Sequence, residues 1–422
     1  MSPLPEENRI RDRDASGAAR ADVDVLANLD TLTGRIAPRP AHAWRVPLQI
    51  AACALGIRIV SAVLAFAANL AFPLYQRQQF TVFHTASPFW DTFARYDSGF
   101  YAGIAWDGYA PLAGGRSNIA FFPVYPMLMR LIGRLFGRQH ATYYLSGIAI
   151  SWTCFILAMV ALYYLARLDL PRRQAQRAVL LTAIFPFSFF FGVVYSESTF
   201  LLFAILSIYC FRTQRWITGG LCGAVATATR VPGILMVPAL AWIAWRTAGP
   251  ARRDQFMAVA GLTLAASGFM AYSVYIHQLT GNAFEWAATL QRWGYHPGGN
   301  PWMAPVRLFG QLLTHPYLYL TTDPMAPYDV LYGVTGVLFV AAVPFVWSRL
   351  GFAYGLFMLL NLWLPFSSGV FEGMGRYCSL LFPCFIWLAT VRSRWLSTAL
   401  VVGFAMFYTL GLALFTTIHP IF

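Results

Sequence analysis

The chain has 422 residues, of which 58% are hydrophobic and only 11% are charged, and its mean hydropathy is +0.55. Soluble domains carry about 25% charged residues, so this deficit excludes an ordinary soluble protein and predicts a helical protein that crosses a membrane several times. The net charge is +13, and all 30 basic residues are arginines. Twelve of them lie in short loops between apolar runs, which fits the positive-inside rule better than a nucleic-acid partner.

The first 46 residues are polar, with seven arginines and seven acids. They predict a cytoplasmic tail, residues 1–46, before a transmembrane domain over residues 47–422. The tail contains two Asp-x-Asp pairs, Asp12/Asp14 and Asp22/Asp24, of the kind that holds a metal in nucleotide-sugar enzymes. Since these acids lie in a solvated tail, and the seven histidines show no ligand spacing, we expect no metal and no cofactor.

The apolar runs predict an all-α bundle of about 11 transmembrane helices. The runs span residues 47–74, 141–166, 178–194, 198–211, 217–229, 231–246, 256–277, 329–347, 351–370, 378–391 and 395–416. Six cysteines are scattered through them without a Cys-x-x-Cys pair, which indicates small buried apolar residues rather than disulfides or ligands.

A further apolar run, residues 118–137, decides the topology. If it lies in the interface, the arginine-rich loops all fall on the inner side and two long segments, 75–140 and 278–328, become outer loops. If it crosses the membrane, the arginine-rich loop 167–177 lies outside instead. We favour the interfacial interpretation, because it gives an orderly distribution of arginines, and the ordinary crossing remains the alternative.

The acids outside the tail are unevenly distributed in this topology. Only Asp169 and Asp254 are on the inner side, and eight others are on the outer side. These eight are Asp91, Asp97, Asp107, Glu197, Glu285, Asp323, Asp329 and Glu372. Chemistry or binding is therefore expected at the outer face.

The stretch RYDSGFYAGIAWDGYAP, residues 95–111, contains the acid with the clearest signal. Aromatic and aliphatic residues recur around Asp97 at helical spacing, which predicts one short helix in the first outer loop with Asp97 in its apolar stripe. A carboxylate in that position is costly unless it is paired or used, and it is a candidate general base. An ion pair with Arg95 or another arginine is the alternative. Asp91 and Asp107 have ordinary positions near the helix ends.

Four blocks in order resemble one family. They are RYDSGFYAGIAWDGY with NIAFFPVYPMLMRLIG (residues 95–109 and 118–133), FPFSFFFGVVYSESTFLL (185–202), GGLCGAVATATRVPGILMVPAL (219–240) and GMGRYCSLLFPCF (373–385). Together they resemble the PIG-V family, the second GPI mannosyltransferase family with its bacterial relatives, in the GT-C glycosyltransferase superfamily. The resemblance covers about residues 50–390, apart from the loop over 279–328.

The resemblance implies a GT-C-like bundle and a sugar donor carried on a polyprenyl phosphate. Asp97 corresponds to the first-loop acid taken as the catalytic base. Arg230 and Arg376 lie in matching motifs at predicted outer span ends and are candidates to bind the donor phosphate, although both could simply reach the interface.

Five further residues are predicted to bind substrate. They are Arg95, Tyr101, Tyr195, Glu197 and Tyr377. Glu197 could instead be a favourable charge at a helix start, with Ser196 as N-cap. Arg58 lies within the first span and could pair with a carboxylate or reach the interface.

These observations predict a glycosyltransferase that moves a hexose, mannose by resemblance, to an acceptor hydroxyl with inversion. The acceptor is an unknown glycan, lipid or protein. The absence of lysine favours a GC-rich bacterial source, so we expect a multi-pass protein of the inner membrane with its site facing the periplasm. A transporter or flippase, which would favour midplane ionisable groups and internal repeats, and a non-catalytic assembly subunit are the alternatives.

Overall fold

The computed structural model describes residues 44–75, 87–111, 117–137, 139–296 and 298–421. The chain divides into two units, residues 1–48 and 49–422, and apart from the first four residues of α2 every feature below lies in the second unit. All regular structure in the described ranges is helical, which confirms the all-α prediction. Both Asp-x-Asp pairs and almost all of the predicted tail lie outside the described residues.

Five helices of the described chain are long and apolar enough to cross a membrane. They are α2 (Arg45–Ala71), α7 (His140–Ala166), α12 (Arg252–Thr280), α16 (Ala326–Leu350) and α20 (Arg394–Thr416). Even the 23-residue α20 extends about 34 Å, enough for a hydrocarbon core of about 30 Å. Four shorter helices coincide with other predicted runs, namely α9 (Glu197–Arg212), α10 (Trp216–Thr227), α11 (Pro232–Thr247) and α17 (Phe352–Phe366). The predicted count of about 11 transmembrane helices is not confirmed.

Two of the predicted runs are not single helices. The run 178–194 divides into α8 (Arg172–Ile184) and the 3₁₀ turn η2 (Ser188–Gly192), and the run 378–391 divides into α18 (Met374–Ser379) and α19 (Phe382–Leu388). Each break lies beside a proline, Pro186 or Pro383, which lacks a backbone N–H and disfavours helix in the preceding residue. The η2 residues are all buried, as irregular backbone at membrane depth must be.

Small residues bring α10 and α12 close together. A Cβ added to Gly220 would lie 2.5 Å from the carbonyl oxygen of Gly261, and one added to Gly268 would lie 1.9 Å from that of Ala224. Such close approach is how small residues stabilise helix pairs in membranes, where apolar contact with lipid is equally available. This packing holds the end of α10, and Arg230 follows directly after it.

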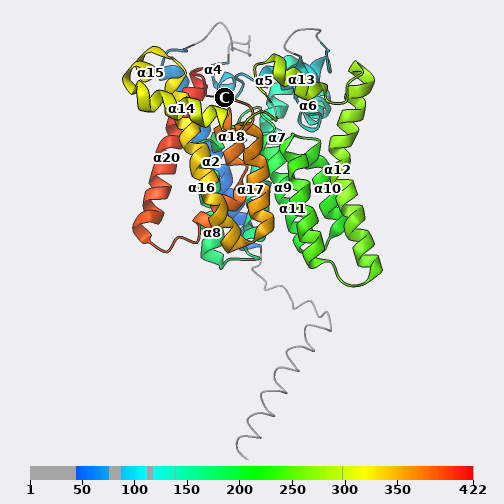
Figure 1. Cartoon of the computed structure of the whole chain (residues 1–422). Helices are drawn as coiled ribbons and strands as arrows, with labels where there is room; N and C mark the ends of the chain where they lie inside the picture. Colours follow the sequence, from blue (N-terminus) through cyan, green and yellow to red (C-terminus); the bar gives the residue numbers. More distant parts are fainter. Residues whose placement is uncertain (1–43, 76–86, 112–116, 138, 297, 422) are drawn as a thin grey trace, which may run out of the picture. The chain divides into compact units, whose positions relative to one another are not determined.

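Short helices gather at one end of the long ones (Figure 1). They are α4 (Pro88–Asp91), α5 (Ser98–Trp106), η1 (Asn118–Ala120), α6 (Val124–Leu135), α13 (Glu285–Arg292), α14 (Met303–Thr314) and α15 (Pro316–Thr322). The 12 residues of α6 span about 18 Å, too short to cross a bilayer. It is amphipathic, burying Tyr125 and Met129 while Leu131 and Leu135 stay exposed. These features fit the predicted interfacial placement, and which face it occupies stays a prediction.

Candidate active site

Asp97 lies at a turn rather than inside a helix. The expected single helix over residues 90–104 is wrong, because the chain forms α4 and then α5, separated by residues 92–97. Tyr96 in this turn has φ = +49°, a conformation that costs a non-glycine residue about 1–3 kcal/mol and is found mostly at functional sites. Asp97 is the N-cap residue of α5, yet its side chain caps no backbone N–H. Its carboxylate is therefore free to face elsewhere.

Arg95 anchors this turn and does not contact Asp97. Its side chain is fully buried, forms an ion pair with Asp91 at 2.5 Å, and donates hydrogen bonds to the Thr416 carbonyl at 3.1 Å and to Asn69 at 3.3 Å. These contacts tie the turn to α2 and α20. Arg95 is not among the residues lining the cavity described below, so the predicted substrate role of Arg95 has no support in the geometry.

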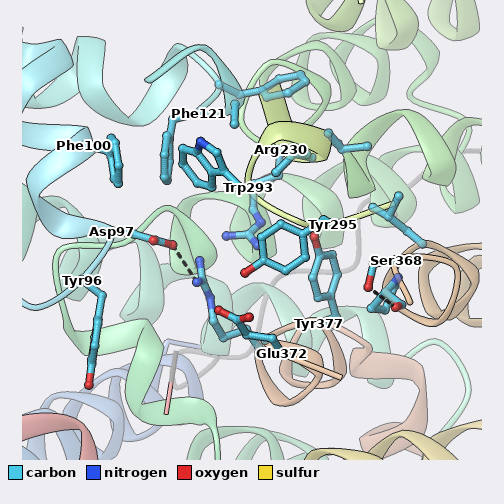
Figure 2. Close-up of a pocket in the computed structure, with 18 of the residues that line it drawn as sticks. Tyr96, Asp97, Phe100, Phe121, Arg230, Trp293, Tyr295, Ser368, Glu372 and Tyr377 are labelled. Carbon is cyan, nitrogen blue, oxygen red and sulfur yellow. Dashed lines mark hydrogen bonds and ion pairs between the residues drawn. The ribbon is translucent and has the colours of Figure 1, made fainter. Parts of the chain in front are cut away.

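Arg376 connects two carboxylates that are far apart in the sequence. Its Nη1 lies 2.7 Å from Asp97 Oδ2 and its Nε lies 2.8 Å from Glu197 Oε1. The same Glu197 oxygen lies 2.6 Å from Nη1 of Arg230. Figure 2 shows the Asp97 contact as a dashed line, with Arg230 behind it. The three blocks of the sequence that carry Asp97, Arg230 and Arg376 thus meet in one charge cluster.

The two acids of this cluster differ in exposure. The Glu197 side chain is 0% exposed, whereas that of Asp97 is 23% exposed. A fully buried carboxylate shared by two guanidinium groups is a fixed structural partner, because removing either contact would leave an uncompensated buried charge. Asp97 is the partner of Arg376 that an incoming ligand could replace.

Ser196, at the start of α9, and Tyr101, in α5, support the cluster. Ser196 is the N-cap residue of α9, as predicted, but its side chain caps no backbone N–H. Its hydroxyl instead lies 2.8 Å from the Tyr101 hydroxyl and accepts a hydrogen bond from Arg230 at 3.3 Å. Burial raises the pKa of Tyr101 well above its usual value, so this phenol stays protonated.

Aromatic rings lie against both guanidinium groups. The Arg376 guanidinium carbon is 4.6 Å from the ring centre of Tyr195 and 5.3 Å from that of Phe190, and the Arg230 carbon is 5.7 Å from that of Tyr377. Cation–π contacts of this kind hold a guanidinium in place without using its N–H donors. The Nε of Arg230 has no hydrogen-bond partner in the described part of the chain.

The cluster opens into a cavity of about 870 Å³. Five predicted site residues line it, namely Asp97, Tyr101, Arg230, Arg376 and Tyr377. Tyr195 and Glu197 are in contact with the guanidinium groups without lining the cavity. The cavity is large enough for a sugar ring with a phosphate, since ligand pockets commonly measure about 300–1,000 Å³.

The sequence interpretation missed a second carboxyl group in the cavity, Glu372. Burial raises the pKa of Glu372, and the negative charges of Asp97 and Asp329 raise it further. A hydrogen bond with Tyr295 has the opposite effect and lowers it. Burial, the negative charge of Glu372 and the shared hydrogen bond raise the pKa of Tyr295. Glu372 was counted only as one of the outer acids. Its position four residues before Arg376 was the available signal, and nothing in the sequence pairs it with Tyr295.

Arg58 follows neither of its two predicted alternatives. It is 1% exposed in the middle of α2, and donates hydrogen bonds to the Tyr408 hydroxyl at 2.9 Å and the Ser188 carbonyl at 3.3 Å. Its guanidinium carbon also lies 4.1 Å from the Phe155 ring centre. It therefore joins α2 to α20, η2 and α7 through neutral groups, and reaches neither the interface nor a carboxylate in the described residues.

Within the described ranges, no group of three or more His, Cys, Asp or Glu side chains is arranged to hold a metal ion.

The fold and the site define a helical membrane protein with an arginine–carboxylate cluster in a cavity at one end. Residues 56–250 match the family model described as mannosyltransferase (PIG-V). This match confirms the resemblance to the PIG-V family over that range. Asp97, Glu197 and Arg230 fall inside it, whereas Arg376 and Glu372 do not.

The chain is also similar to two solved structures. The Archaeoglobus fulgidus oligosaccharyltransferase in the apo form is 12% identical, with a TM-score of 0.46, 87% of this chain covered and 56% of that chain covered. ArnT from Cupriavidus metallidurans, bound to undecaprenyl phosphate, is 13% identical with a TM-score of 0.47, and 90% of this chain and 77% of that chain are covered. The chain thus spans 56% of the length of the oligosaccharyltransferase. Likenesses at these TM-scores carry no weight for the reaction. Comparison with curated proteins gives no match.

Proposed function

We propose that this protein is a glycosyltransferase that moves a hexose from a polyprenyl-phosphate donor to an acceptor hydroxyl, and that this hexose is mannose. The reaction takes place at the outer face of a bacterial inner membrane and inverts the anomeric carbon. The family match supports mannosyl transfer. The observation that carries the proposal is the bridge from Arg376 to Asp97 and Glu197 in a cavity that Arg230 also lines.

Arginine suits the binding of the donor phosphate, because guanidinium groups bind phosphate oxygens with strong charge-assisted hydrogen bonds. Glu197 keeps Arg230 and Arg376 together, and the donor phosphate replaces the Asp97 carboxylate at Nη1 of Arg376. Donor binding therefore frees Asp97 at the moment when a base is needed. The rings around the guanidinium groups keep them oriented during this exchange.

The acceptor oxygen then attacks the anomeric carbon from the side opposite the phosphate. The bond between that carbon and the phosphate oxygen breaks, its electron pair stays on the phosphate, and the hydroxyl proton passes to Asp97. The products are an inverted glycoside, polyprenyl phosphate and protonated Asp97. Arg230 and Arg376 stabilise the charge that develops on the departing phosphate.

Asp97→Asn tests both parts of this mechanism. Transfer from a radiolabelled polyprenyl-phosphate hexose in proteoliposomes should fall by about 10²–10⁴-fold, since general base assistance is lost. Polyprenyl phosphate itself should bind more tightly to this variant than to the unmodified protein, because the asparagine amide competes poorly with phosphate for Arg376.

Asp107→Asn is the matched control, because Asp107 ends α5 and is not a lining residue of the cavity. It should change neither transfer nor binding. Near-normal turnover by Asp97→Asn would refute the assigned role. Movement of the labelled lipid across the bilayer without any sugar transfer would favour a flippase instead.

A further inference from the structure

Three aromatic rings form one wall of the cavity, on the side of Asp97. The rings of Phe100 and Phe121 are stacked with centres 4.8 Å apart and planes 16° apart. The Trp293 ring centre lies 5.1 Å from that of Phe100 and 5.7 Å from that of Phe121. In Figure 2 these three rings form a group apart from Tyr295, which lies on the other side of Arg230. We call Phe100, Phe121 and Trp293 the aromatic wall.

The end of α13 fixes the position of Trp293. Gly294 has φ = +93° and donates to the Gln291 carbonyl at 3.0 Å, while the N–H of Tyr295 donates to the Leu290 carbonyl at 3.1 Å. This pair of bonds is a Schellman motif, which requires a left-handed residue after the helix and so selects glycine. The turn separates Trp293 and Tyr295, and both line the cavity.

The segment after this turn is fastened to the loop before α18. The N–H of His296 donates to the Ser368 carbonyl at 2.9 Å, and the N–H of Gly299 donates to the Ser367 carbonyl at 3.1 Å. The segment that carries Trp293 is thus held by backbone hydrogen bonds within α13 and to the loop before α18. A rigid aromatic face is what stacking against a ligand requires.

Two features distinguish this wall from ordinary core packing. All three rings line the cavity, so part of their surface is left without protein neighbours. The indole nitrogen of Trp293 also has no hydrogen-bond partner among the described residues, although a buried tryptophan N–H usually has one. An aromatic face that lines a cavity suits the apolar C–H face of a pyranose ring.

We propose that the aromatic wall is a stacking platform for a pyranose ring, and that this ring belongs to the acceptor. This inference rests on the proposed function. Asp97 precedes Phe100 by three residues at the start of α5, which places their Cβ atoms roughly 5–6 Å apart. A ring stacked on the wall therefore presents a hydroxyl to Asp97, while the donor phosphate occupies the guanidinium groups on the other side of that carboxylate.

The test compares Trp293→Ala with Trp302→Ala. Trp302 lies in the same outer segment, is 71% exposed and is not a lining residue of the cavity. With methyl α-mannopyranoside as acceptor, Trp293→Ala should raise the acceptor KM by about two- to tenfold and leave the donor KM unchanged. Trp293→Phe, which keeps a ring, should have a smaller effect, and Trp302→Ala none. A change in the donor KM alone, or equal effects of Trp293→Ala and Trp302→Ala, would overturn the proposal.

A binding measurement separates this proposal from the proposed function. Methyl α-mannopyranoside should protect Trp293 of the full-length protein in nanodiscs from oxidation by N-bromosuccinimide, and mass spectrometry of the peptides should show Trp302 oxidised as before. The same protection is expected in Asp97→Asn, where transfer is lost. Protection without transfer by the unmodified protein would leave the wall intact and refute the reaction. Transfer without protection would refute the wall.

Discussion

At the scale of single residues, the acids of this site differ in burial and in the number of arginines that they contact. Glu197 is fully buried and contacts both Arg230 and Arg376, so it holds the guanidinium groups in place. Asp97 is partly exposed and contacts only one of them. Glu372 is a third case, because burial and the negative charges of nearby acids raise its pKa despite the opposing charge of Arg376.

Glu372→Gln should stabilise the protein at neutral pH. The pKa of Glu372 is raised in the folded state, so the favourable contribution of this group is present below its usual value of 4.5 and is lost as pH rises through the folded value. Glutamine cannot ionise, so the variant does not lose this contribution to stability as the pH rises. In detergent, the Tm of Glu372→Gln should therefore exceed that of the unmodified protein at pH 7, and the two should converge as pH falls below 4.5.

Glu285→Gln serves as the comparison for this measurement. Glu285 is paired with Arg292 at the start of α13 and is not a lining residue of the cavity. Its replacement should give no gain in Tm. Equal Tm differences for the two variants at every pH would show that burial of Glu372 is not the cause.

At the scale of elements, close helix packing places the second arginine. Gly220 and Gly268 let α10 and α12 approach so closely that a Cβ at either position would collide with a backbone carbonyl oxygen of the other helix. Arg230 lies between α10 and α11, so its reach towards Glu197 depends on how α10 is seated. The α10–α12 contact thus supports the site from outside the cavity.

Gly220→Ala should lower the Tm of the purified protein. The added methyl would lie 2.5 Å from the Gly261 carbonyl oxygen, and overpacking of this kind costs about 1–3 kcal/mol. Gly56→Ala in α2 is the matched variant, since a Cβ there meets nothing within 4 Å. It should leave the Tm unchanged or raise it. Equal effects of the two substitutions would contradict the packing argument.

The sequence predicted most helices because apolar runs of sufficient length have few alternatives in a membrane. It misplaced helix ends at Pro186 and Pro383, and it merged α4 and α5, because helical spacing does not reveal the left-handed turn at Tyr96. Asp97, Arg230 and Arg376 could be predicted from motifs. The pairing of Glu372 with Tyr295 could not, because it depends on how the segment after α13 folds back.

At the scale of the whole molecule, the proposed topology places acids on one side and most arginines on the other. Three cysteines introduced into a variant without native cysteines test it. Ala110→Cys and Gln139→Cys flank α6, and Arg392→Cys lies in a loop between α19 and α20; all three positions are exposed. A membrane-impermeant maleimide should label the first two from outside intact spheroplasts and the third only after permeabilisation. Labelling of positions 110 and 139 from opposite sides would show that α6 crosses the membrane.

The charge cluster also has a consequence for selectivity. Two guanidinium groups and the carboxylates of Asp97 and Glu197 sum to zero, so the unliganded cavity attracts dissolved anions only weakly. Chloride or inorganic phosphate gains little by displacing a carboxylate already in place. In the proposed reaction, a phosphate attached to a long hydrocarbon chain has membrane anchoring in its favour, and this anchoring offsets the cost of displacing Asp97. We therefore propose that the neutrality of the empty cluster favours lipid-linked phosphates over dissolved anions.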